Sequence, residues 1–354
     1  MSFTDPLTLG QRLVAVLEEG QRSTTYKLAV MVTLLDLAVE LVTDDPDAAI
    51  TVDLNLFARR LMDMYWRQTR PLDGHILRQS NTGNSFILSE TLKLRSAVAS
   101  PSLRDVPFDT AATDAPDIYG RSHLAIKKKL VELPLKLLQK VGTGPHECFL
   151  YDDSWLGHPS DAVIEAHGNC IELFPGVCHT LARLAPLVKP AFQLAWVDDV
   201  RRMNKQLLDE GPDLAHHLFG ADRVSLQRPA RILGEHFGND CFYCHSHLRA
   251  RRHVDHVLPW SRVGIDGLTN LVLACPSCNG NKSDLLPDPD HVTRALGRGR
   301  DVLAELAQAI HWPSQYDRVA SAAHGLYSTQ PPSTPVWYAA RQVAPLGRID
   351  IVWG

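Results

Sequence analysis

Two short cysteine pairs constrain this chain more than any other feature of its sequence. Cys241 and Cys244 form one CxxC pair, Cys275 and Cys278 form another, and thirty residues separate the two pairs. Four thiolates satisfy the tetrahedral preference of structural Zn²⁺, and the interval is long enough to hold a β-hairpin. In a reducing compartment, such pairs indicate a metal site rather than disulfides. The pattern therefore predicts a structural zinc site made of four cysteines.

Length and composition set broad limits on the rest of the chain. Its 354 residues are enough for two or three domains, and 45% hydrophobic with 21% charged residues is typical of a globular protein. We find no apolar run long enough to cross a bilayer and no signal-peptide pattern, so we expect no membrane partner and a cytoplasmic location. The formal net charge of −4 does not indicate a nucleic-acid binder, although a local basic surface is sufficient for phosphate contacts.

The segment between the cysteine pairs has the pattern of two strands followed by a helix. The run HVDHVL predicts a strand that ends at Pro259, and NLVLA predicts a second strand directly before Cys275. Pro276 then suits the first turn of a short helix. On a regular strand Asp255 and His256 face opposite sides, so both reach one phosphate only where the strand twists, bulges or ends.

This arrangement resembles the zinc-stapled HNH endonucleases, whose nuclease module is a ββα-metal finger. The resemblance covers roughly 45 to 60 residues, and the run NGNKSD is also similar to the HNH domain of the large CRISPR effector nuclease. It implies that His256 is the general base, that Asp255 and Asn279 hold a catalytic divalent metal, and that Asn270 orders the loop between the strands. The final position is Asn rather than His, which makes the chain an HNN variant and favours Mg²⁺ or Mn²⁺ as the catalytic ion.

The chemistry of these residue types agrees with the roles that the resemblance implies. Hydrolysis of a phosphodiester needs a base to deprotonate water, and a histidine that titrates near neutrality suits that task. A hard divalent ion on oxygen ligands suits the stabilisation of the developing charge. Cationic side chains near the motif are candidate phosphate contacts: Arg249, Arg251, Arg252, Arg262 and Lys282. Residues 121–140 carry six Lys and Arg, which indicates either a second nucleic-acid contact or a solvated helix face.

The expected fold class is α+β. Helical patterns at 23–43, 54–68, 177–188 and 191–208 predict a mainly helical N-terminal domain, whereas 71–120 has the composition of loops. We expect three parts: a recognition or regulatory domain at 1–225, the HNH nuclease domain at 226–290, and a small helical C-terminal extension with a Pro-rich linker at 291–354.

The expected function is that of a metal-dependent endonuclease that hydrolyses phosphodiester bonds, with DNA as its partner and substrate and a role in restriction or anti-phage defence. The N-terminal domain is expected to bind a substrate feature, a protein partner or a regulatory ligand. Two alternatives stay open. One is a zinc finger that binds nucleic acid without cutting it, and the other is an RNA-cutting, toxin-like nuclease.

Overall fold

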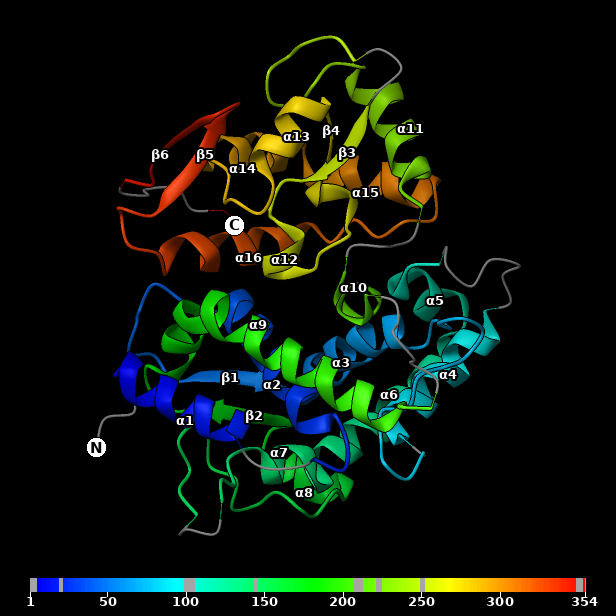
Figure 1. Cartoon of the computed structure of the whole chain (residues 1–354), viewed down its shortest axis with the longest axis vertical. Helices are drawn as coiled ribbons and strands as arrows, with labels where there is room; N and C mark the ends of the chain where they lie inside the picture. Colours follow the sequence, from blue (N-terminus) through cyan, green and yellow to red (C-terminus); the bar gives the residue numbers. More distant parts are fainter. Residues whose placement is uncertain are drawn as a thin grey trace. The chain divides into compact units, whose positions relative to one another are not determined.

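The computed structural model describes most of the chain, namely residues 5–18, 22–83, 85–98, 106–142, 146–206, 213–220, 225–248, 252–347 and 353. The chain divides into two compact units, Met1–Asp222 and Arg223–Gly354. Figure 1 shows the N-terminal unit in blue to green and the C-terminal unit in green to red. Helices predominate and the sheets are two-stranded, which confirms the expected α+β class. Within the described residues, no helix combines the length and the apolar character needed to cross a membrane.

The N-terminal unit consists of helices around a small antiparallel sheet. Its elements are α1 (Pro6–Glu18), α2 (Tyr26–Leu41), β1 (Ile50–Asp53), α3 (Leu54–Gln68), α4 (Phe86–Ala97), α5 (Phe108–Asp114), α6 (Pro116–Glu132), α7 (Pro134–Leu138), α8 (Asp161–Ala166), β2 (Cys170–Leu173), α9 (Val177–Met203) and α10 (Leu214–Phe219). Strands β1 and β2 pair in register from Ile50 opposite Leu173 to Asp53 opposite Cys170.

Helix α2 is the buried centre of this unit. It packs against α9, α3 and α7, and the uncharged run from Leu28 to Leu35 is almost fully buried around its whole circumference. A helix that is apolar on every side is stable only when it is enclosed in this way. The two acidic residues that follow are paired, because Asp36 accepts from Lys189 at 2.5 Å and Glu40 from Arg60 at 2.7 Å. These partners offset the cost of placing charges near the core.

Two of the predictions for this unit are wrong. Residues 71–120 contain α4 and α5 rather than loops only. Helix α4 lacks a clear amphipathic period because α3 and α6 cover it from two sides, and its buried Arg95 stacks on Trp66 with 3.8 Å between the guanidinium carbon and the ring centroid. The break expected between 188 and 191 is also absent. Helix α9 continues through Pro186 and Pro190, because its packing along α2 outweighs the hydrogen bonds that the prolines remove.

The C-terminal unit contains the two-strand and helix pattern that the sequence predicts. Its elements are α11 (Gln227–Phe237), β3 (His253–His256), α12 (Trp260–Val263), η1 (Leu268–Asn270), β4 (Leu271–Ala274), α13 (Pro276–Lys282), α14 (Pro289–Leu296), α15 (Arg300–Ala309), α16 (Tyr316–Ser328), β5 (Pro335–Ala339) and β6 (Gln342–Pro345). Strands β3 and β4 are antiparallel, with Asp255 opposite Val272 and His256 opposite Leu271. Helices α11 and α13 both contact β3.

The last part of the chain packs directly onto the two-strand and helix segment. Helix α14 spans the boundary that the sequence suggested at residue 290. Strand β5 exchanges backbone hydrogen bonds of 2.7 Å with the segment before α14, from Trp337 to Leu286 and from Asp288 back to Trp337. The Trp337 ring meets Tyr243 edge-on at 5.0 Å between centroids. The Pro-rich stretch therefore leads into a hairpin that belongs to the same compact unit.

Candidate active site

The four cysteines of the two CxxC pairs converge in the C-terminal unit. Their sulfur atoms all lie within 4.8 Å of one another, and Sγ of Cys244 is 3.8 Å from Sγ of Cys275. Zinc–sulfur bonds of about 2.3 Å in a tetrahedron place the sulfur atoms about 3.8 Å apart. The donor set and its spacing therefore fit Zn²⁺, and together the four cysteines form a cluster that can bind a metal.

Backbone geometry positions this cluster. The amide of Cys241 donates to the carbonyl of Ser246, and the amide of Phe242 donates to Leu273 of β4, both at 2.8 Å. The amide of Cys275 donates to Sγ of Cys241 at 3.3 Å. Burial raises the pKa of Cys241. Burial also opposes the ionisation of Cys244, but hydrogen bonds from Ser246, Cys241 and Cys278 together lower the pKa of Cys244 to about 6.

Asp255 is buried on β3 between a phenol and an ammonium group. Tyr243 donates to its Oδ2 at 2.5 Å, and Nζ of Lys282 lies 3.1 Å from the same oxygen. Burial and the Asp255 carboxylate raise the pKa of Tyr243 well above its ordinary value, which keeps the phenol a donor. Lys282 also donates to the backbone carbonyl of His256 at 2.7 Å, and it is only 1% exposed. This burial does not fit the phosphate contact that we expected for Lys282, because the ammonium group already faces a carboxylate inside the unit.

His256 faces a different set of partners, as the alternation of side chains along β3 requires. Its Nε2 is 2.8 Å from Oδ1 of Asp266, and its ring lies 5.3 Å from the ring of Trp260. Among the described residues, no hydrogen-bond partner is recorded for its Nδ1. Sequence reasoning missed Asp266, because it follows His256 by ten residues in a loop whose path no local pattern reveals. A carboxylate in this position fixes the orientation of an imidazole and stabilises its protonated form.

Asn270 is completely buried where the loop between the strands closes. Its side-chain oxygen accepts from the amide of Leu258 at 2.8 Å, and its side-chain nitrogen donates to the carbonyls of Leu258 at 3.1 Å and Ile265 at 3.0 Å. Its backbone carbonyl accepts from Val257 at 2.8 Å. Asn270 thus connects both ends of the loop that follows His256.

Asn279 on α13 lies beside His253 of β3. Its Nδ2 is 3.0 Å from Nδ1 of His253, which is exposed and lies on the same face of β3 as Asp255. The signal available in the sequence was the two-residue spacing between His253 and Asp255. Asn279 and His253 together present nitrogen and oxygen donors at the β3–α13 junction, while Asp255 lies deeper.

The remaining cations expected to contact phosphate are divided between exposed and partly buried positions. Arg252 is exposed and donates to Oδ1 of Asn239 at 2.8 Å. Arg262 on α12 donates to the carbonyl of Asp284 at 3.4 Å, and burial lowers its pKa. Arg249 and Arg251 lie outside the described residues. In the N-terminal unit, the basic segment 121–140 forms α6 and α7, and Lys128 there pairs with Asp161 at 2.9 Å.

Another group of ligand-type side chains lies in the N-terminal unit. Nε2 of His146 is 2.8 Å from Oδ2 of Asp153 and 3.8 Å from Sγ of Cys148. The Asp153 carboxylate also accepts from Gln139 at 3.0 Å and lies 3.7 Å from Lys136. Its charge is therefore satisfied within the fold, and we assign the group a structural role.

Two family models match the chain. A model for HNH endonuclease matches residues 241–285, which are the cysteine cluster, β3, β4 and α13. A model described as a domain of unknown function (DUF8808) matches residues 7–215, more than half of the chain. No curated protein and no solved structure matches this chain. The chain therefore belongs to the DUF8808 family through its N-terminal unit and carries an HNH endonuclease domain in its C-terminal unit.

Proposed function

We propose that this protein is a metal-dependent endonuclease that hydrolyses phosphodiester bonds in DNA. The observation that carries the proposal is the 2.8 Å contact between Nε2 of His256 and Oδ1 of Asp266. His256 directly follows Asp255 on β3 and lies next to the junction with α13. A module that only held nucleic acid would have no use for an imidazole oriented by a carboxylate. For the cellular role we propose restriction or anti-phage defence.

His256 is the proposed general base. Asp266 engages Nε2, which leaves Nδ1 as the nitrogen that would take a proton from water. The Asp266 carboxylate would then stabilise the imidazolium as the water oxygen attacks phosphorus. Asn270 supports this arrangement from a distance, because its hydrogen bonds hold the loop that begins at Val257 and carries Asp266.

The β3–α13 junction is the proposed place for the catalytic divalent ion. Asn279 offers an amide oxygen, Asp255 a carboxylate and His253 an imidazole nitrogen, and His253 is the most exposed of the three. Such an ion neutralises the charge that develops on the phosphoryl group and stabilises the leaving 3′ oxygen. Oxygen ligands favour Mg²⁺ or Mn²⁺, and His253 as a third ligand would shift the preference from Mg²⁺ towards metals that accept nitrogen.

The four cysteines are proposed to hold structural Zn²⁺ and so to fasten this finger. They connect the segment before β3 to the end of β4 and the first turn of α13. Because so small a module has a limited core, zinc binding would contribute directly to its folding free energy.

Plasmid cleavage by the full-length protein tests the proposal. The wild type and His256→Ala would be compared in Mg²⁺, in Mn²⁺ and in EDTA, with His236→Ala as a control for removing an exposed histidine from the same unit. We expect metal-dependent cutting that His256→Ala loses and His236→Ala retains. Cutting by His256→Ala at the wild-type rate would reject the base assignment.

A second arm separates the proposed substrate from its alternatives. DNA and RNA of matched sequence would be offered in parallel, because the catalytic residues act on the phosphodiester and do not read the sugar. Cleavage of RNA alone would favour a toxin-like nuclease. Tight binding of nucleic acid without cleavage of either substrate, by protein loaded with zinc, would favour a binding finger.

A further inference from the structure

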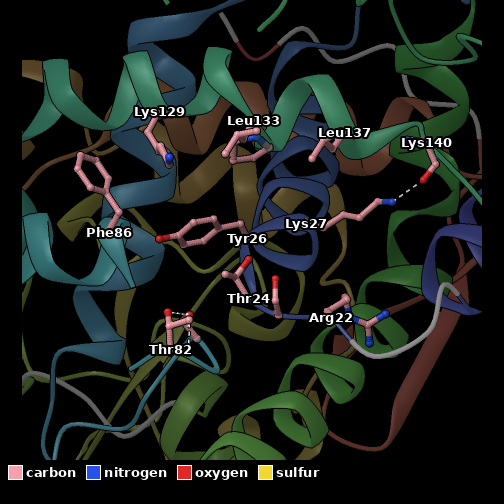
Figure 2. A pocket seen from close by; sticks show the side chains of 13 residues that line it. Arg22, Thr24, Tyr26, Lys27, Thr82, Phe86, Lys129, Leu133, Leu137 and Lys140 are labelled. Atoms are coloured by element: carbon pink, nitrogen blue, oxygen red, sulfur yellow. Dashed lines mark hydrogen bonds between the residues drawn. The ribbon is translucent and has the colours of Figure 1, made fainter. Parts of the chain in front are cut away.

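A pocket of about 690 Å³ opens in the N-terminal unit, and its lining includes no residue of the proposed nuclease site. It lies between the segment that leads into α2, the loop and first residue of α4, and the facing sides of α6 and α7 (Figure 2). Its volume falls within the range of small-ligand sites, which are about 300 to 1,000 Å³. The whole pocket is built from the part of the chain that the DUF8808 model matches.

The lining of this pocket is cationic. It includes Arg22, Lys27, Lys129 and Lys140, and none of the described lining residues is acidic, although Arg22 is paired with Asp199 at 2.7 Å outside the lining. Lys27 donates to the backbone carbonyl of Lys140 at 2.7 Å, so these two residues meet at one end of the pocket (Figure 2). Helix α2 begins at Tyr26 in the lining, and its N-terminal end adds a positive potential there. A concave surface with this charge selects anions.

The other end of the pocket is aromatic and apolar. Figure 2 shows the Tyr26 ring extending towards Phe86, while Leu133 and Leu137 follow one another along the α6–α7 side towards Lys140. Phe86 is 38% exposed, Leu133 42% and Leu137 43%, and these values place all three among the exposed large hydrophobic residues of the chain. Exposed apolar side chains that gather in one concave place mark a ligand surface more often than scattered ones do.

The ammonium group of Lys129 joins the two kinds of surface. It lies 5.8 Å from the centroid of the Phe86 ring and 3.0 Å from Glu132, which is outside the lining. Hydroxyl groups cover the remaining floor, where Oγ of Ser80 and Oγ1 of Thr82 are 2.9 Å apart. A ligand that fills the pocket therefore contacts cationic, hydroxyl, aromatic and aliphatic side chains.

We propose that this pocket binds a nucleotide, with its phosphate at the Lys27–Lys140 end and its base between Tyr26 and Phe86. Lysines are point donors for phosphate oxygens, hydroxyl groups match a ribose, and aromatic rings stack on every base. The same chemistry belongs to a free nucleotide and to a nucleotide within a single strand. The proposal does not depend on the nuclease function, because no residue of the pocket belongs to the HNH domain.

Isothermal titration of the full-length protein in EDTA tests this inference, because EDTA prevents metal-dependent cleavage. The probes are the four ribonucleoside monophosphates and triphosphates, inorganic phosphate, adenosine and a 5′-phosphorylated oligo(dT) of eight residues. The variants are Lys27→Ala at the phosphate end and Phe86→Ala at the base end. Lys128→Ala is the matched control, because Lys128 lies on α6 next to the lining residue Lys129 but pairs with Asp161 and does not line the pocket.

We expect at least one nucleotide or the oligonucleotide to bind more tightly than phosphate or adenosine alone. Lys27→Ala should weaken that binding about tenfold or more, as the loss of a charge-assisted hydrogen bond does. Phe86→Ala should weaken it as well, and Lys128→Ala should leave it unchanged. If only free nucleotides bind, the ligand is a free nucleotide. If only the oligonucleotide binds, the ligand is a nucleotide within a single strand.

Three results would overturn the inference. One is the absence of binding by every nucleotide and by the oligonucleotide. A second is binding that Lys27→Ala and Lys128→Ala reduce equally, which would show that the general surface charge and not the pocket attracts the ligand. Binding of phosphate as tight as that of the nucleotides would likewise remove the base from the site.

Discussion

Replacing Lys282 by methionine distinguishes a buried structural role from a phosphate contact. Nζ of Lys282 lies 3.1 Å from the Asp255 carboxylate and donates to the carbonyl of His256 at 2.7 Å, and the residue is 1% exposed. Methionine keeps most of the side-chain volume but leaves Asp255 as a buried carboxylate whose remaining partner is Tyr243. Removing one partner of a buried pair costs about 3 to 5 kcal/mol. We therefore expect Lys282→Met to destabilise the C-terminal unit by that amount.

Hydrogen exchange is the suitable assay, because a chain with two units need not unfold in one transition. Opening that is easier by 3 to 5 kcal/mol should accelerate exchange of the β3 and β4 amides by about 10² to 5 × 10³-fold. Arg231→Met is the control, since Arg231 pairs with Glu235 at 3.9 Å with both side chains more than half exposed. Such a surface pair contributes about 1 kcal/mol or less.

A double substitution tests the explanation itself. Asp255→Asn combined with Lys282→Met removes both charges, and Tyr243 can still donate to the amide oxygen. The β3 and β4 amides of the double variant should therefore exchange more slowly than those of Lys282→Met alone. If Lys282→Met accelerates exchange less than about fivefold, or weakens DNA binding without any loss of stability, the buried-pair argument is refuted.

Three further substitutions test other parts of the unit. Asn270→Ala leaves three buried backbone groups of Leu258 and Ile265 without the partner that Asn270 provides. We therefore expect the unit to lose about 3 kcal/mol of stability, measured by hydrogen exchange of the β3 and β4 amides. A loss below about 1 kcal/mol would contradict the role of Asn270 in holding the loop. Asp266→Asn should slow DNA cleavage about 10- to 100-fold with DNA binding unchanged in a filter assay, and an unchanged rate would exclude Asp266 from positioning His256. Cys275→Ser should lower both solubility and the zinc-to-protein ratio measured with a colorimetric chelator, whereas an unaltered ratio would show that the four cysteines are not the zinc site.

Local sequence patterns were sufficient to predict those elements that contain diagnostic residues. The four cysteines and Pro276 mark the knuckles and the start of α13, and the alternation around Asp255 marks β3. Helix α3 occupies 54–68 as its amphipathic period predicts. The same method failed for α4, because helices cover two of its sides and buried polar residues such as Arg95 obscure its period. It also failed for α9, which was predicted as two helices but continues through Pro186 and Pro190 along α2.

The environment of Asp255 was beyond the reach of local pattern, because three distant segments create it. Tyr243 comes from the first cysteine knuckle and Lys282 from the end of α13. Trp337 of β5 packs edge-on against Tyr243, and β5 is fixed by its backbone bonds to Leu286 and Asp288. The position of the phenol that reaches Asp255 thus depends on a hairpin more than fifty residues beyond α13. Residues after the matched segment 241–285 are therefore part of what holds the proposed active site in place, and a fragment that ends at residue 285 would lack Trp337 and His291, which both pack edge-on against the Tyr243 ring.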